Sequence, residues 1–218
     1  MCRSYSEKRF QNILYRIAVP LFTWAFHLRV VGQENIPDEG GALIASNHIS
    51  YLDPPILGAA SKRELFYMAR DTLFRPKPVG DFLRYLNAFP VKRDRPDRKA
   101  LKTAITLLES GKLVLVFPEG TRSYDGSLGK PHLGVGFIVY HSTVPIIPAY
   151  ISGTEKALPR GALLIKRAEI NVHFGRPMDM EELRSMPRPR EVYPKIGERI
   201  MSEIAKLQAR YRKGPGGR

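Results

Sequence analysis

The stretch that decides the fold lies at residues 42–55 and reads ALIASNHISYLDPP. Four of its first five residues are apolar and the fifth is a small serine, which is typical of a buried strand. The residues that follow are of mixed character, as in a loop. Asp53, Pro54 and Pro55 then indicate the start of a helix, with Asp53 as its N-cap and the prolines in its first turn. A buried strand that leads through a loop into a helix favours an α/β sheet domain.

The same alternation continues on both sides of this stretch. Further strands are predicted at residues 27–32, 65–69, 88–91, 113–117, 144–150 and 170–174. Helical patterns are predicted at residues 96–110, 134–142 and 191–211. Because 218 residues suit one compact domain, we expect a single α/β domain at 27–211, with a central mixed sheet flanked by helices. The basic, glycine-rich residues 212–218 should form a disordered tail.

The N-terminal residues 1–26 combine aromatic with basic side chains. Their most apolar stretch, residues 17–28, is shorter than the roughly 20 residues that a bilayer crossing needs. No small-residue cleavage site follows, so a signal peptide is not predicted. Aromatic residues such as Phe22, Trp24 and Phe26 suit a membrane interface, and we expect an amphipathic, membrane-associating helix. The alternative is a core helix packed on the domain.

The chain is strongly basic, with 35 Lys and Arg against 21 Asp and Glu and a formal net charge of +14. Such a charge predicts attraction to nucleic acid, an anionic lipid surface or a phosphorylated substrate. We expect no nucleic-acid partner, because no helix-turn-helix signature, zinc-ligand pattern or RNP-like aromatic pattern occurs. The single cysteine, Cys2, excludes an internal disulfide and has no metal-ligand spacing to histidines, so a reducing compartment and no metal are expected.

A histidine and a carboxylate occur five residues apart within residues 42–55. The loop can fold so that Asp53 accepts a hydrogen bond from one ring nitrogen of His48, which leaves the other nitrogen free to take a proton from an alcohol. The alternative is that Asp53 only caps the helix and His48 is an ordinary loop histidine. A serine hydrolase is not indicated, because the chain has no G-x-S-x-G elbow.

A second polar turn follows a predicted strand at residues 116–123, which read VFPEGTRS. The guanidinium of Arg122 suits a phosphate, Glu119 can orient Arg122 or an acceptor, and Gly120 lets the backbone approach a ligand. A salt-bridged turn is the alternative.

Two further segments stand at predicted strand ends. Residues 89–95 read FPVKRDR, and Arg93 is a candidate for phosphate binding. The charges that follow, Arg98, Lys99 and Lys102, are expected to face solvent or lipid. Residues 144–150 read VPIIPAY, and their two prolines favour an edge or end strand that lines a hydrophobic cleft, with core packing as the alternative.

These segments occur in a fixed order: H-x-x-x-x-D at 48–53, F-P-x-K-R-D at 89–94, F-P-E-G-T-R-S at 117–123 and V-P-I-I-P at 144–148. Over residues 28 to about 175 the chain resembles the glycerolipid acyltransferase family, of the bacterial type that acylates 1-acylglycerol-3-phosphate. The resemblance implies an α/β domain held on the membrane by N-terminal helical structure. It also implies an acyl-CoA or acyl-carrier-protein donor, and neither a cofactor, a metal nor a covalent intermediate.

The resemblance implies a role for individual residues. His48 would be the general base and Asp53 its orienting partner. The acceptor phosphate would be held by Arg93, Glu119, Gly120, Thr121 and Arg122. Arg70 stands where the family often has a lysine, and with Lys92 it could contact an oxyanion or a phosphate. The usual F-K-x-G segment reads PHLG here, at 131–134.

The resemblance therefore implies transfer of a fatty acyl group to the 2-hydroxyl of 1-acyl-sn-glycerol-3-phosphate, which forms phosphatidate. The alternatives are another lysolipid or glycerol-3-phosphate as acceptor, or a non-catalytic peripheral lipid-binding protein. We expect a monomer that associates with the membrane lipid surface, peripherally or monotopically, on the cytoplasmic face of the cell membrane.

Overall fold

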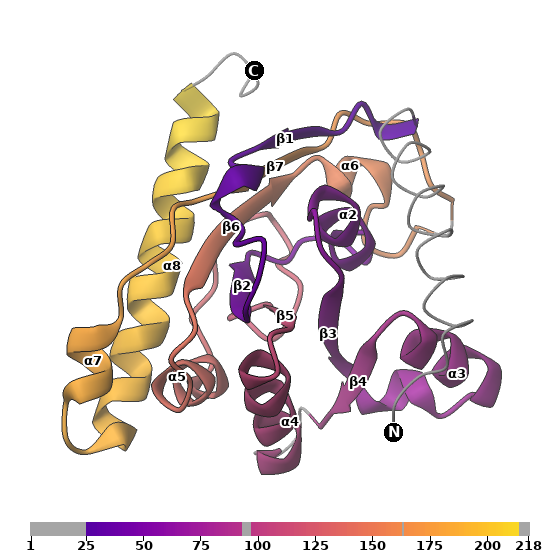
Figure 1. Cartoon of the computed structure of the whole chain (residues 1–218). Coiled ribbons are helices and arrows are strands. Elements are labelled where there is room, and N and C mark those ends of the chain that lie inside the picture. Colours follow the sequence, from indigo (N-terminus) through magenta and orange to yellow (C-terminus); the bar gives the residue numbers. More distant parts are fainter. Residues whose placement is uncertain (1–24, 93–96, 163, 214–218) are drawn as a thin grey trace.

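The computed structural model describes residues 25–92, 97–162 and 164–213. Within them, seven strands form one sheet in the order β1-β7-β6-β2-β5-β3-β4 (Figure 1). The strands are β1 (Arg29–Val31), β2 (Ala42–Ser46), β3 (Leu65–Arg70), β4 (Ala88–Val91), β5 (Leu113–Val116), β6 (Ile146–Ser152) and β7 (Asn171–Phe174). Only the β6–β7 pair of this described sheet is antiparallel, so the predicted mixed sheet is confirmed.

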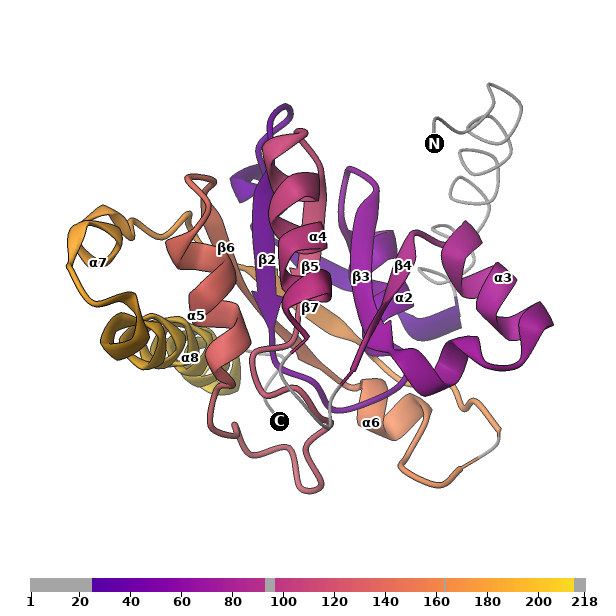
Figure 2. The same ribbon diagram turned by 90° about the horizontal axis from the view of Figure 1, so that it is seen from below.

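Helices cover both faces of the sheet. One face carries α4 (Arg98–Glu109), α5 (Leu133–Tyr140), α7 (Glu181–Ser185) and α8 (Pro189–Lys213), and Figure 2 shows α4, α5 and α8 side by side. The other face carries α2 (Asp53–Ala60) and α6 (Thr154–Ala157). The short helices η1 (Gln33–Asn35) and η2 (Asp71–Phe74) follow β1 and β3, and α3 (Lys77–Tyr85) connects η2 to β4.

The central strand β2 is buried along its whole length because helices cover both of its faces. Leu43 and Ala45 point into the core beneath α4, α5 and α8, whereas Ala42 and Ile44 point into the core beneath α2. A parallel strand covered on both faces must be apolar throughout, which explains why this segment shows no polar alternation.

Five of the strands run in the same direction, namely β2, β3, β4, β5 and β6, so their carboxyl ends meet at one edge of the sheet. In open α/β sheets, ligands bind outside the carboxyl ends of the strands. The predicted site segments at residues 47–53, 92 and 117–123 all begin at this edge.

Of the two predictions for residues 144–150, the edge strand was wrong and the core-packing alternative is confirmed. The strand β6 begins at Ile146 and lies between β7 and β2. Pro148 is tolerated there because the β6–β7 ladder starts only at Ala149, so no strand residue of β7 faces its missing N–H. The Pro148 carbonyl on that side accepts the N–H of Gly175 at 2.7 Å.

The chain ends differ in part from the sequence prediction. The expected N-terminal helix lies outside the described residues except at its end, where Phe26 is buried in the sheet core instead of at an interface. The last helix continues to Lys213, beyond the predicted start of the tail. In the part of the chain that the structure describes, no helix is both long enough and apolar enough to span a bilayer.

Candidate active site

Asn47 fixes the loop that carries His48. It is the first residue after β2, and its side chain makes two hydrogen bonds to the backbone of Ile151 in the neighbouring strand β6. Its Nδ2 donates to the Ile151 carbonyl at 3.0 Å, and its Oδ1 accepts the Ile151 N–H at 2.8 Å. This paired contact ties the start of the loop to the sheet, so His48 leaves the strand end in a defined direction.

His48 and Asp53 form the hydrogen bond that their spacing predicts. Nδ1 of His48 lies 2.7 Å from Oδ2 of Asp53, and both side chains are buried. Because an ionised carboxylate only accepts hydrogen bonds, Nδ1 carries the proton in this pair. In the described part of the chain Nε2 has no hydrogen-bond partner, so it is the nitrogen left to take up a proton.

The carboxylate of Asp53 organises the loop as well as the histidine. Oδ2 also accepts the N–H groups of Ile49 at 2.6 Å and Ser50 at 2.8 Å, and Oδ1 accepts the hydroxyl of Thr154 at 2.5 Å. The expectation that Asp53 is the N-cap of its helix was wrong. The N-cap is Leu52, and Asp53 is the first residue of α2, with its carboxylate turned back into the preceding loop.

The imidazole of His48 is held on its flat side as well. The ring of Phe117, just after β5, stacks on it with the centroids 4.0 Å apart and the planes 15° apart. The His48 carbonyl accepts the N–H of Ser123 at 2.7 Å. The two polar turns predicted after β2 and β5 therefore lie together in the folded chain.

Glu119 acts on the backbone of this site. Its Oε1 accepts the N–H of His48 at 3.1 Å, and its Oε2 accepts the N–H of Gly129 at 2.8 Å. Burial raises the pKa of Glu119 above its ordinary value, against the lowering effect of the Gly129 and His48 N–H groups. In the described residues no ion pair joins Glu119 to Arg122, so the salt-bridged turn is not formed.

Glycine is required at position 120. Its φ of +64° lies in the left-handed region, and a Cβ there would come within 2.5 Å of the His132 ring. Gly120 thus allows the turn after β5 to close against the loop that leads to α5.

Arg122 stacks on an aromatic ring from the loop that carries His48. Its guanidinium lies over Tyr51 at 3.5 Å from the ring centroid. Stacking occupies the face of the guanidinium and leaves its N–H edge for a ligand. Next to it, Arg160 lies over Tyr124 at 3.6 Å and donates to the Arg122 carbonyl at 3.3 Å. Thr121, the other predicted residue of this turn, is exposed.

Two of the remaining predicted cations lie at the same edge of the sheet. Arg70 ends β3 and is in register with Val91 of β4, and Lys92 follows directly; Arg70 and Lys92 are both exposed. Arg93 lies outside the described residues. Arg98, Lys99 and Lys102 line a shallow groove of about 550 Å³ along α4, as expected for a solvent-facing or lipid-facing surface.

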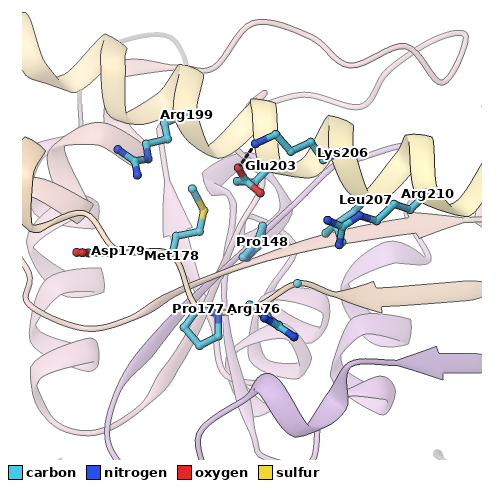
Figure 3. A pocket seen from close by; sticks show the side chains of 11 residues that line it. Pro148, Arg176, Pro177, Met178, Asp179, Arg199, Glu203, Lys206, Leu207 and Arg210 are labelled. Atoms are coloured by element: carbon cyan, nitrogen blue, oxygen red, sulfur yellow. Dashed lines mark hydrogen bonds and ion pairs between the residues drawn. The ribbon is translucent and has the colours of Figure 1, made fainter.

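A separate pocket of about 230 Å³ lies between α8, β6 and the segment after β7 (Figure 3). Its apolar floor includes Pro148, Met178 and Leu207. Its charged lining mixes signs, and Glu203 accepts a hydrogen bond from Lys206 at 2.6 Å (Figure 3). None of its residues belongs to the group around His48. Within the described residues no group of three or more His, Cys, Asp or Glu side chains could hold a metal ion.

Several of the residues that build the site, Asn47 among them, were not assigned a role from the sequence. Thr154 lies 101 residues after Asp53 in the chain and reaches it only because β6 lies beside β2. Phe117 and Tyr51 were quoted within their motifs without a function. A weak signal existed for Thr154, since Gly153 and Thr154 follow a buried strand as the other polar turns do.

Comparison with known proteins supplies the family. The family model described as acyltransferase matches residues 27–152. The chain belongs to the acyltransferase family. The matched region contains His48, Asp53, Glu119 and Arg122, and it ends two residues before Thr154.

Individual acyltransferases are similar over most of the chain. The 1-acyl-sn-glycerol-3-phosphate acyltransferase of Bacillus subtilis is 31% identical over 183 residues, which cover 83% of this chain and 88% of that protein. The enzyme of that name from Streptococcus pneumoniae is 29% identical over 174 residues, 78% of this chain and 61% of that protein. The crystal structure of the Thermotoga maritima 1-acyl-sn-glycerophosphate acyltransferase, PlsC, matches with a TM-score of 0.74 at 27% identity, covering 96% of this chain and 85% of that chain.

Proposed function

We propose that this acyltransferase moves a fatty acyl group from acyl-CoA or acyl-carrier protein to the 2-hydroxyl of 1-acyl-sn-glycerol-3-phosphate and so forms phosphatidate. The names of its relatives support this acceptor. The single observation that carries the chemistry is the buried His48–Asp53 pair, whose Nε2 is left to take a proton. The enzyme would act as a monomer, without a cofactor, on the membrane lipid surface at the cytoplasmic face of the cell membrane.

In this mechanism Nε2 of His48 removes the proton from the acceptor hydroxyl as its oxygen attacks the thioester carbonyl. A carbon–oxygen bond forms, and the carbonyl oxygen carries the negative charge of a tetrahedral intermediate. The carbon–sulfur bond then breaks, and the imidazolium returns its proton to the departing thiolate. Asp53 keeps Nδ1 protonated and stabilises the positive charge that His48 carries between the two steps.

Arg122 is proposed as the main contact for the acceptor phosphate, because its face is stacked on Tyr51 and no described residue accepts a hydrogen bond from its guanidinium N–H groups. Gly120 and Thr121 of the same turn are proposed to contact the phosphate as well, together with Arg70, Lys92 and Arg93. Arg70 and Lys92 are also proposed as contacts for the oxyanion. For Glu119 we propose a role other than the phosphate contact that the resemblance implies. Both its oxygens already accept backbone N–H groups, and a carboxylate would repel phosphate, so it positions His48 instead.

The His48→Ala variant tests the proposal. General base catalysis contributes about 10²- to 10⁴-fold, so the variant should lose at least that factor in turnover while it stays folded. The assay measures free thiol released from palmitoyl-CoA by protein on liposomes, with and without 1-acylglycerol-3-phosphate. The His141→Ala variant, in which an exposed histidine is removed from the far end of α5, should keep full activity. Undiminished activity of His48→Ala would exclude the mechanism.

The Arg122→Ala variant tests the phosphate contact. Hydrogen bonds to charged groups contribute about 1.5–3 kcal/mol, so the KM for the acceptor should rise roughly 10- to 100-fold while kcat changes less. Arg122→Lys should recover part of this loss, because it keeps the charge but not the planar fork. The control is Arg199→Ala in the separate pocket, which should leave the acceptor KM unchanged. An unchanged acceptor KM in Arg122→Ala would remove Arg122 from the acceptor site.

The same assay separates the alternatives. Thiol release that depends on glycerol-3-phosphate or on another lysolipid would identify that compound as the acceptor in place of 1-acylglycerol-3-phosphate. Transfer from acyl-carrier protein without transfer from palmitoyl-CoA would identify acyl-carrier protein as the donor. Liposome binding with no transfer from either donor would indicate a non-catalytic lipid-binding protein.

A further inference from the structure

The connection between α6 and β7 exposes two adjacent aliphatic side chains. Leu164 is 78% exposed and Ile165 is 57% exposed. The next two residues, Lys166 and Arg167, are also exposed, and Arg160 adds a third exposed cation to the same connection. Large aliphatic side chains next to cations and open to solvent are typical of segments that bind membrane surfaces.

This connection is attached to the candidate active site. The Leu158 carbonyl accepts the hydroxyl of Ser50, two residues after His48, at 3.0 Å. Arg160 contacts both Tyr124 and the carbonyl of Arg122. The Lys166 N–H donates to the Ala157 carbonyl at 2.8 Å, so Lys166 lies next to the end of α6.

Other exposed apolar side chains lie in segments that follow the same strand ends. Tyr51 follows β2, while Tyr124 and Leu133 follow β5, and all three are exposed. Figure 2 shows α6, the connection after it and the loop after β5 along one edge of the molecule, toward which β2 points. The connection leaves the sheet after Ser152 of β6 and re-enters it at Asn171 of β7, and these two residues are in register. The segment that carries Leu164 and Ile165 therefore starts and ends at the edge that also carries His48.

We propose that the α6–β7 connection is a membrane-docking loop. Leu164 and Ile165 enter the lipid bilayer, while Arg160, Lys166 and Arg167 meet anionic lipid headgroups. Docking through this edge brings His48 and Arg122 to the surface from which a lipid acceptor would be drawn. The need for such docking rests on the proposed function, but the binding itself is measured without turnover.

An anionic bilayer fits this loop better than an acidic protein. Transfer of the two neighbouring aliphatic side chains from water into the apolar interior of a bilayer is favourable, whereas an acidic protein surface would match only the cations. The flanking cations match the negative surface potential of a cytoplasmic leaflet, which attracts basic residues close to the membrane.

The first experiment measures co-sedimentation with vesicles of phosphatidylcholine and phosphatidylglycerol. The Leu164→Ser/Ile165→Ser double variant should bind at least about tenfold more weakly, because two inserted aliphatic side chains are lost. The matched control is Val31→Ser, since Val31 is 55% exposed on β1 and should leave binding unchanged. Equal binding of the double variant and the wild type would overturn the proposal, provided that both unfold at the same temperature.

Charge is tested separately. Lys166→Glu should weaken binding to the phosphatidylglycerol-containing vesicles several-fold and have little effect on pure phosphatidylcholine vesicles. An equal loss on both kinds of vesicle, or on neither, would contradict the headgroup contact.

Turnover distinguishes a failure of docking from a failure of the proposed function. The double variant should keep the wild-type rate on a short-chain, monomeric lysophosphatidate in solution and lose rate on the same headgroup presented in vesicles. If the wild type transfers to neither acceptor, the proposed function fails, while the vesicle-binding result still decides the docking loop. Unchanged vesicle binding with loss of transfer from acyl-carrier protein alone would assign the loop to a protein partner and overturn the proposal.

Discussion

At the scale of single residues, the candidate site depends on two buried carboxylates with different tasks. Asp53 accepts four hydrogen bonds, from His48, two backbone N–H groups and Thr154, so it is fully satisfied without water. Within the described residues, Glu119 accepts hydrogen bonds from two backbone N–H groups and no side chain, and it spans from His48 to Gly129. One carboxylate therefore orients the imidazole, and the other holds the backbone from which the imidazole projects.

Glu119 should make stability depend on pH. Burial raises its pKa in the folded protein above the ordinary value of 4.5, so the folded state binds this proton more tightly than the unfolded chain. The stability contributed by the protonated form is present below about pH 4.5 and is lost as the pH rises through the folded pKa. The free energy of unfolding of the wild type, minus that of Glu119→Gln, should therefore fall as the pH rises from about 4.5 through the folded pKa of Glu119.

Urea denaturation between about pH 4 and pH 8 measures this difference. The amide introduced by Glu119→Gln can supply only one acceptor oxygen where two N–H groups require one each, so a constant loss of about 1–3 kcal/mol is expected in addition. A difference that stays constant or rises with pH would contradict the assigned direction of the shift.

At the scale of elements, the close packing of α5 on α8 supports the face of the sheet opposite α2. Gly136 of α5 lies directly against the backbone of Tyr193 in α8, so a Cβ at this position would overlap the Tyr193 carbonyl oxygen. Gly134, two residues earlier in α5, has only the flexible end of Leu101 nearby, at 3.3 Å. The two positions in one helix therefore differ in whether a Cβ atom can be accommodated.

Gly136→Ala should destabilise the protein by about 1–3 kcal/mol, because the two helices must move apart to admit the methyl group. Gly134→Ala is the matched control and should be neutral or stabilising by up to about 1 kcal/mol, since alanine favours the helix. Thermal and urea unfolding of both variants provide the comparison. Equal effects of the two substitutions would show that the α5–α8 contact does not limit the packing.

At the scale of the whole molecule, sheet topology and net charge act together. The carboxyl ends of β2 to β6 gather His48, Arg70, Lys92 and Arg122 at one edge, and the chain carries a formal charge of +14. A basic protein with this edge exposed is suited to an anionic surface that presents a phosphorylated substrate.

Binding to vesicles that contain phosphatidylglycerol should therefore weaken as salt is added. The Debye length falls from about 10 Å at 0.1 M salt to about 3 Å at 1 M, so attraction by the net charge should be largely screened at the higher concentration. Co-sedimentation should show at least a severalfold loss with these vesicles and little change with pure phosphatidylcholine. Salt-independent binding to both would mean that apolar insertion alone accounts for membrane association.

The sequence by itself determined the alternation of strands and helices and the polar turns at strand ends. Strands at residues 42–46 and 88–91 were predicted with their observed bounds, because short apolar runs between turn residues are local signals. Local signals also predicted α4 to within two residues at each end, where Asp97 accepts the Ala100 N–H as N-cap. The short helices α3, α6 and α7 were not predicted from the sequence pattern.

Only the tertiary structure decided which turns meet and what each polar side chain binds. Thr154 reaches Asp53 because β6 pairs with β2, and Glu119 reaches the His48 backbone because β5 pairs with β2 on its other side. The interior position of Pro148 follows from the same strand order. Strand order joins residues about 70 to 100 positions apart through backbone pairing that the local pattern does not encode, so these partners could not be found along the chain alone.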